Sequence, residues 1–227
     1  MTPPEDRLEA FWPFVRAQLP TPGSRVIEIG CGPLGGFVPR LDREGYDAVG
    51  IDPEAPESPG YHRVEFERFQ LPQPVDAVVA CTSLHHVADL DDVLDRVASA
   101  LVTGGVVVVV EWASERFDEA TAKWCFSRLE NSTTEDDHGW LHKHRDDWLA
   151  SQHDWDTYLR GWAKHEGLHP GQQIVQGLDA RFERAVSTFA PYFFPDLADT
   201  SEADEQRAID AGLIQATGVR HAARLTR

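Results

Sequence analysis

The chain has 227 residues, 41% of them hydrophobic, which is enough for one sizeable core in a single domain with insertions. Its 38 acidic and 21 basic residues give a formal net charge of −17, and the absence of a basic run disfavours nucleic acid and anionic membranes as partners. Three widely spaced cysteines and a start without the regions of a secretory leader indicate a reducing compartment. We therefore expect a soluble cytoplasmic protein, a monomer or a homodimer.

A first amphipathic helix is predicted over residues 5 to 19, with Pro13 kinking or delaying it. Its apolar face carries Leu8, Phe11, Trp12 and Val15. We expect this helix to pack beside the ligand site that the next segment predicts.

A short buried strand followed by glycines is the most informative segment, RVIEIGCGPLGG over residues 25–36. Glycines at 30, 32, 35 and 36 allow a tight turn with open backbone N–H groups, and we call residues 30–36 the glycine loop. A second apolar run ends at Asp52, twenty-two positions after Gly30, where a carboxylate can accept both hydroxyls of a ribose. Strand, loop, helix, strand and acid in this order predict a nucleotide-type ligand.

Two other interpretations of the glycine loop stay open at this point. It can be a plain strand-to-helix turn, or the dinucleotide loop of an NAD(P)-dependent oxidoreductase, whose spacing and acid it matches. Glu28 favours a cationic ligand, because a carboxylate there would repel a pyrophosphate but balance the ammonium group of S-adenosylmethionine. The chain also lacks a Tyr-x-x-x-Lys pair. We therefore rank the oxidoreductase second.

These residues resemble a known family. Glu28-Ile-Gly-Cys-Gly32 with Asp52 is similar to the first two motifs of class I S-adenosylmethionine-dependent methyltransferases. ERFQLP, residues 67–72, resembles the family segment whose first residue, here Glu67, meets the adenine amino group. The resemblance spans roughly residues 20 to 113, and weaker likeness to bacterial members of unassigned substrate continues near residues 190 and 216.

The resemblance implies a doubly wound, mostly parallel, seven-stranded sheet of the Rossmann-like methyltransferase type, with S-adenosylmethionine as cofactor. The cofactor contacts expected on this basis are Glu28, Gly30, Cys31, Gly32, Gly35, Asp52, Pro53, Glu67, Arg68, Cys81 and Thr82. Residue patterns add helices over 36–45 and 89–102 and strands over 61–66, 77–81 and 106–110. The last of these is an unbroken β-branched run, typical of a central parallel strand.

The composition changes after residue 113. Six of the seven tryptophans lie between Trp112 and Trp162, and helices are predicted in and after this region over 118–129, 141–150, 154–166 and 172–184. We expect three parts: an α/β core with the first helix (1–113), a helical insertion that caps the substrate (114–180), and a final antiparallel strand pair around a helix at 201–211 (181–227). The aromatic side chains can also serve only to pack helices on the sheet. As substrate contacts we assign Trp12, Trp112, Trp140 and Tyr192.

The insertion also contains a histidine pair with metal-like spacing. His138 and His142 are four residues apart with several aspartates nearby. However, Gly139 separates them and no compact ligand signature is present, so we expect a solvated acidic face and no metal.

The segment after the fourth strand predicts the chemistry. It reads Cys81-Thr82-Ser83-Leu84, without the Asn/Asp-Pro-Pro-Tyr of family enzymes that methylate bases or glutamine. We therefore expect a small-molecule acceptor, partly apolar or aromatic, whose O-, N- or C-nucleophile displaces the sulfonium methyl directly. His85 and His86 follow, and either can be a general base, or both can serve packing, capping or cofactor contact. A further alternative is a non-catalytic module that binds S-adenosylmethionine.

Overall fold

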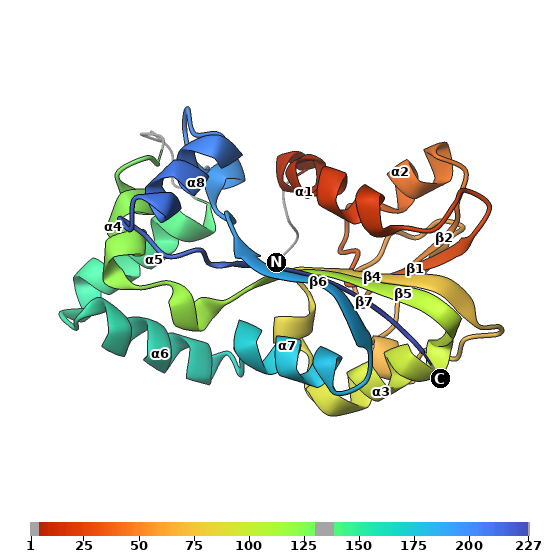
Figure 1. Ribbon diagram of the computed structural model, residues 1–227. Coiled ribbons are helices and arrows are strands. Elements are labelled where there is room, and N and C mark those ends of the chain that lie inside the picture. Colours follow the sequence, from red (N-terminus) through yellow and green to blue (C-terminus); the bar gives the residue numbers. More distant parts are fainter. Residues whose placement is uncertain (1–4, 130–138, 227) are drawn as a thin grey trace. The chain divides into compact units, whose positions relative to one another are not determined.

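The structure, a computed structural model, describes residues 5–129 and 139–226 (Figure 1). Three-residue 3₁₀ turns follow β3 and β4 along the chain, η1 (Phe66–Arg68) and η2 (Leu84–His86). The helices and strands follow the order α1 (Glu5–Gln18), β1 (Arg25–Ile29), α2 (Val38–Arg43), β2 (Asp47–Ile51), β3 (Tyr61–His62), β4 (Val75–Cys81), α3 (Leu90–Ala100), β5 (Leu101–Trp112), α4 (Glu119–Phe126), α5 (Trp140–Ser151), α6 (Trp155–His165), α7 (Gly171–Asp179), β6 (Glu183–Ala190), α8 (Glu202–Asp210) and β7 (Gly218–Arg224).

Seven strands form one sheet in the order β3-β2-β1-β4-β5-β7-β6, and β1 to β5 pair in parallel. β7 runs antiparallel to β5, because residues early in β5 pair with the end of β7 and residues after β5 pair with the start of β7. Gly104 N donates to Leu225 O at 2.7 Å, and Ala113 N donates to Thr217 O at 2.7 Å. The predicted Rossmann-like, mostly parallel sheet is confirmed.

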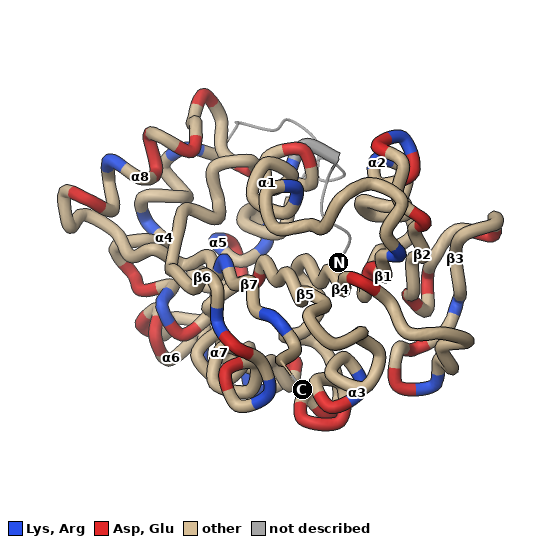
Figure 2. Tube along the Cα trace, turned by 45° about the vertical axis from the view of Figure 1, so that its right-hand side comes forward, with Lys and Arg blue, Asp and Glu red and all other residues tan. Residues whose placement is uncertain are grey.

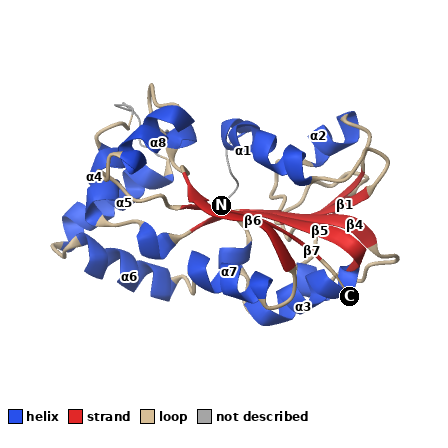
Figure 3. Cartoon of the chain, viewed as in Figure 1, coloured by secondary structure: helices blue, strands red, loops and turns tan. Residues whose placement is uncertain are grey.

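The chain divides into two compact units. The first comprises Met1–Glu111, His169–Thr188 and Val219–Arg227, and the second comprises Trp112–Leu168 and Phe189–Gly218. In the first unit, α1 and α2 cover one face of the sheet and α3 and α7 cover the other (Figure 3). The second unit holds α4, α5, α6 and α8.

The core of the first unit follows from the apolar runs of the central strands. Val78 and Val79 of β4 and Val108 of β5 are fully buried, since helices cover both faces of the sheet. α3 begins where Asp89 accepts a hydrogen bond from Asp92 N at 3.0 Å, and its apolar stripe packs on the sheet. Parallel backbone pairing then brings the carboxyl ends of β1, β2 and β4 side by side.

Two predicted elements differ from the structure. The helix predicted over 172–184 ends at Asp179, and β6 begins at Glu183. The buried apolar spacing of Ile174, Leu178 and Phe182 continues past the end of α7, but residues 183–190 pair in the sheet instead. The third strand covers Tyr61–His62 rather than residues 61–66. In the described ranges, no helix has the length and apolar character needed to cross a bilayer.

Candidate active site

The glycine loop leaves β1 in a conformation that only glycine adopts easily. Positive φ angles occur at Gly30, Gly32, Gly35 and Gly36. A Cβ on Gly30 would overlap the Ser83 side chain, and a Cβ on Gly36 would overlap the Glu28 carboxylate. The glycines therefore serve two purposes, since they form the turn and leave room for two side chains packed beneath it.

Glu28 holds the far end of the glycine loop in place. Its side chain is 1% exposed, and Phe37 N donates to Oε2 at 2.7 Å. Burial raises the pKa of Glu28 to about 8, although backbone N–H donors oppose this shift. The carboxyl group thus ties β1 to the start of α2, and its predicted contact with a cofactor ammonium stays a prediction.

Asp52 meets the loop from the end of β2. Gly32 N donates to Oδ2 at 3.0 Å and Glu54 N donates to Oδ1 at 2.7 Å, so the carboxylate is oriented by backbone from both sides. Tyr61 also lies here, donating to Gly35 O at 3.3 Å, and sequence reasoning missed it. The only sequence signal for Tyr61 is its place in the strand beside β2.

Thr82 is strained and carries an unusual hydroxyl. Its φ is +54°, in the left-handed region that β-branched residues avoid. Oγ1 is buried and has no hydrogen-bond partner among the described nitrogen and oxygen atoms. Strain and an unsatisfied hydroxyl at the carboxyl end of a central strand are typical of ligand sites.

The other predicted cofactor contacts lie nearby in the same unit. Cys31 and Cys81 are buried, and burial raises the pKa of both thiols. Pro53 is exposed directly after Asp52. Glu67 lies half-buried in η1, while the exposed Arg68 pairs with Glu65 at 2.9 Å. Roles for these residues in cofactor binding stay predictions.

A buried acid that sequence reasoning missed lies behind the two histidines. Glu111, at the end of β5, is 0% exposed, and its Oε2 lies 2.5 Å from His85 Nδ1. His85 is 7% exposed, whereas His86 is exposed with its ring centroid 4.2 Å from that of His85. A carboxylate that ends an otherwise unbroken valine run is the sequence signal that could have found it. The two histidines are thus distinguished by their environment.

The four predicted substrate contacts fall in both units. Trp12, in the first, packs 5.6 Å from Phe37 between ring centroids. In the second, Trp112 lies 5.0 Å from Trp140, and both rings contact Phe193. Tyr192 packs edge-on against Phe193 at 5.2 Å, so the last three belong to one aromatic cluster. Substrate contact by any of them stays a prediction.

Only one histidine of the predicted pair in the insertion, His142, is among the described residues. His138 lies outside the described residues, and His142 is buried in α5. Among the residues described, no three or more His, Cys, Asp and Glu side chains are grouped so as to hold a metal ion.

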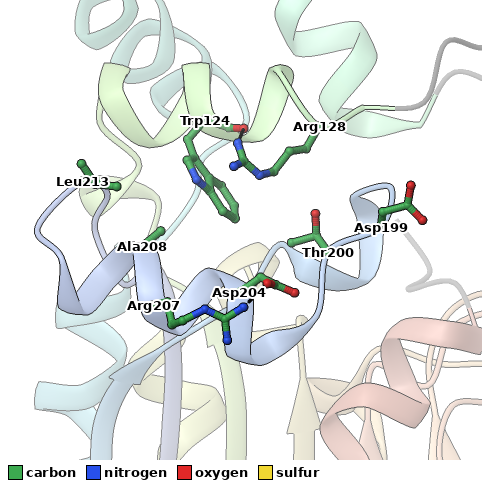
Figure 4. A pocket seen from close by; sticks show the side chains of 8 residues that line it. All are labelled: Trp124, Arg128, Asp199, Thr200, Asp204, Arg207, Ala208 and Leu213. Carbon is green, nitrogen blue, oxygen red and sulfur yellow. Dashed lines mark hydrogen bonds and ion pairs between the residues drawn. The ribbon is translucent and has the colours of Figure 1, made fainter.

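A surface pocket occurs in the second unit, and none of its lining residues is a predicted site residue (Figure 4). The Arg128 guanidinium lies 4.0 Å from the centroid of the Trp124 ring, and Arg207 pairs with Asp204. Its lining is completed by Asp199, Thr200, Ala208 and Leu213. The described hydrogen bonds of these charged groups are local, and we assign this pocket no role.

A family model described as a methyltransferase domain matches residues 5–159. Solved structures share the fold at low identity. An S-adenosylmethionine-dependent methyltransferase from Mesorhizobium loti is 21% identical, with a TM-score of 0.56 over 96% of this chain and 99% of that chain. The N-methyltransferase NodS from Bradyrhizobium japonicum WM9, in complex with S-adenosyl-L-homocysteine, is 14% identical, with a TM-score of 0.56 over 98% and 89%.

A third similar structure is geranyl diphosphate C-methyltransferase from Streptomyces coelicolor A3(2), 15% identical, with a TM-score of 0.53 over 96% of this chain and 80% of that chain. A search of curated proteins found no match. The family model covers well over half of the chain and favours methyl transfer over the oxidoreductase alternative. The chain therefore belongs to the methyltransferase-domain family, as a class I enzyme that uses S-adenosylmethionine.

Proposed function

We propose that this enzyme methylates a small, partly apolar or aromatic molecule whose nucleophilic atom carries a proton, and that His85 accepts that proton. The observation that carries the proposal is the buried pair of His85 and Glu111 at the carboxyl ends of β4 and β5. A histidine oriented by a carboxylate is a common arrangement for a general base. His86 has no such partner among the contacts described, which supports His85 over it.

The residues present fit the cofactor. The glycine loop offers a cradle that Cβ atoms would fill, the Asp52 carboxylate accepts from Gly32 N beside it, and the buried Thr82 hydroxyl has no nitrogen or oxygen partner among the described residues. When bound, S-adenosylmethionine supplies a methyl group on a positively charged sulfur. The chain then has to hold the acceptor in line with that methyl, exclude water and remove a proton.

The charge distribution supports a small acceptor. Acidic residues outnumber basic ones by 38 to 21, and lysines and arginines are scattered among them along the tube of Figure 2. Nucleic-acid partners need clustered positive charge to replace phosphate counterions. Structures with this fold are named for N-methylation and for C-methylation, so the acceptor atom is left open.

This proposal is tested with methyl-tritiated S-adenosylmethionine and a panel of phenols, catechols, amines and enolisable carbonyl compounds. We expect label to enter at least one panel compound above the rate without enzyme. Total transfer RNA and denatured protein serve as parallel acceptors. Label that enters only these macromolecules would reject the small-molecule proposal. Tight cofactor binding without transfer to any acceptor would instead support the non-catalytic alternative.

Replacing Thr82 with valine should weaken cofactor binding without destabilising the protein. Valine keeps the branched shape and backbone strain of threonine, so the change removes only the hydroxyl. We expect the affinity for S-adenosylhomocysteine, measured by calorimetry, to fall about 5- to 10-fold. A decrease of this size corresponds to the loss of one hydrogen bond. The unfolding free energy should stay level or rise by about 1 kcal/mol.

Thr217→Val is the matched control. Thr217 is fully buried in the second unit, and its Oγ1 also has no partner among the described residues. Its replacement should affect stability in the same way and leave S-adenosylhomocysteine affinity unchanged. Equal affinities in wild type and Thr82→Val would remove Thr82 from the cofactor site.

A further inference from the structure

Glu111 is bound by three donors from one short segment. Ser83 N and Leu84 N donate to Oε1 at 2.7 Å and 2.6 Å, and His85 Nδ1 lies 2.5 Å from Oε2. The carboxylate is 0% exposed, so these groups replace the water that it loses on burial. One side chain of β5 thus holds the whole start of the η2 turn.

This contact decides which ring nitrogen of His85 carries the proton. A carboxylate only accepts hydrogen bonds, so Nδ1 must be the donor. In the neutral ring, Nε2 then holds the lone pair and is the atom that can accept a proton. The opposite tautomer would place two acceptors 2.5 Å apart in a buried site, which is strongly unfavourable.

The η2 turn is also held from the amino end of α7. His169 N donates to His85 O at 3.0 Å, and His169 Nε2 lies 2.9 Å from Val87 O. On the other side, Ser83 Oγ donates to Ile29 O at 2.8 Å, directly before the glycine loop. The backbone that carries His85 is therefore fixed independently of its ring, and Glu111 is what sets the ring.

We propose that Glu111 is a positioning residue that holds His85 as the Nδ1–H tautomer and so keeps the lone pair of the neutral ring on Nε2. Its part in catalysis rests on the function proposed above for His85. In that reaction the acceptor's proton moves to Nε2, and the pair it leaves on the acceptor forms the new bond to the methyl carbon. The pair of the broken S–C bond stays on sulfur, and the imidazolium is balanced by Glu111.

Glu111→Gln tests the positioning directly. Glutamine has the same size, and its amide oxygen can still accept from Ser83 N and Leu84 N. Its amide NH₂ then faces His85 Nδ1 as a donor, which requires the ring to carry its proton on Nε2. The measurement is long-range ¹H–¹⁵N correlation of protein containing ¹⁵N-labelled histidine, at alkaline pH, with the His85 signal identified by its loss in His85→Asn.

We expect the Nδ1–H tautomer for His85 in the wild type and the Nε2–H tautomer in Glu111→Gln. Glu205→Gln is the matched control, since Glu205 is a 1% exposed carboxylate that accepts from Tyr192 N and Phe194 N. That variant should leave the His85 tautomer unchanged. S-adenosylhomocysteine binding by Glu111→Gln shows that it is folded. A wild-type Nε2–H tautomer, or no change in Glu111→Gln, would overturn the proposal.

A second experiment measures turnover with a small acceptor from the panel above that the wild type methylates. Glu111→Gln should lower kcat at least about 100-fold with the Kd for S-adenosylhomocysteine unchanged. If His85→Asn loses turnover while Glu111→Gln keeps it, the positioning role is wrong and the proposed base stands. If His85→Asn keeps full turnover, the proposed base is wrong, and the tautomer experiment still decides what Glu111 holds.

Discussion

Gly30→Ala is expected to lower the affinity for S-adenosylhomocysteine at least about 100-fold, equivalent to about 2.7 kcal/mol. A Cβ at this position would overlap the Ser83 side chain, whose Oγ is bonded to Ile29 O, and φ is +79°. The strained backbone alone costs about 1–2 kcal/mol. Relief requires either the glycine loop or the η2 turn to move, and the glycine loop belongs to the proposed cofactor site. Calorimetric titration with S-adenosylhomocysteine measures the effect.

Gly104→Ala separates the clash from the strain. Gly104 has almost the same φ, +82°, but nothing lies within 4 Å of a Cβ placed there. It should lose about 1 kcal/mol of unfolding free energy and bind the ligand like the wild type. Ser83→Gly in the Gly30→Ala background removes the overlapping Cβ and should recover part of the affinity. Wild-type affinity in Gly30→Ala would show that the loop does not need this glycine.

His85→Asn is expected to reduce kcat at least about 100-fold while leaving the Kd for S-adenosylhomocysteine within about twofold. The asparagine Nδ2 can still donate to Glu111, so the buried carboxylate keeps a partner and the η2 turn keeps its shape. What disappears is the basic nitrogen. Turnover is measured by tritium transfer from the labelled cofactor to a panel compound that the wild type methylates.

His86→Asn is the comparison for this experiment, because His86 is the exposed neighbour on the same turn. We expect it to change kcat by less than about tenfold. A larger loss in His86→Asn than in His85→Asn would make His86 the base. Full turnover in both variants would leave proximity and orientation as the whole mechanism.

Most of the fold was predictable because its signals are local. Apolar periodicity and glycine positions placed β1, β2, β4 and α3 within a few residues. Cofactor contact by the glycine loop and by Asp52 stays a prediction. The helix over 172–184 was extended too far, because pairing of β6 in the sheet is a long-range event that a helical pattern does not report.

By itself, then, the sequence determined the fold class, the cofactor and the segment that carries the histidines, since each depends on residues near one another in the chain. Tertiary structure alone decided which histidine acquires a partner, because Glu111 is 26 residues from His85 and meets it only when β4 and β5 pair. It likewise decided that Ser83 packs under Gly30 and that Thr82 is strained, with no nitrogen or oxygen partner for its hydroxyl in the described ranges. Contacts between distant segments depend on strand register and side-chain direction, which local patterns do not specify.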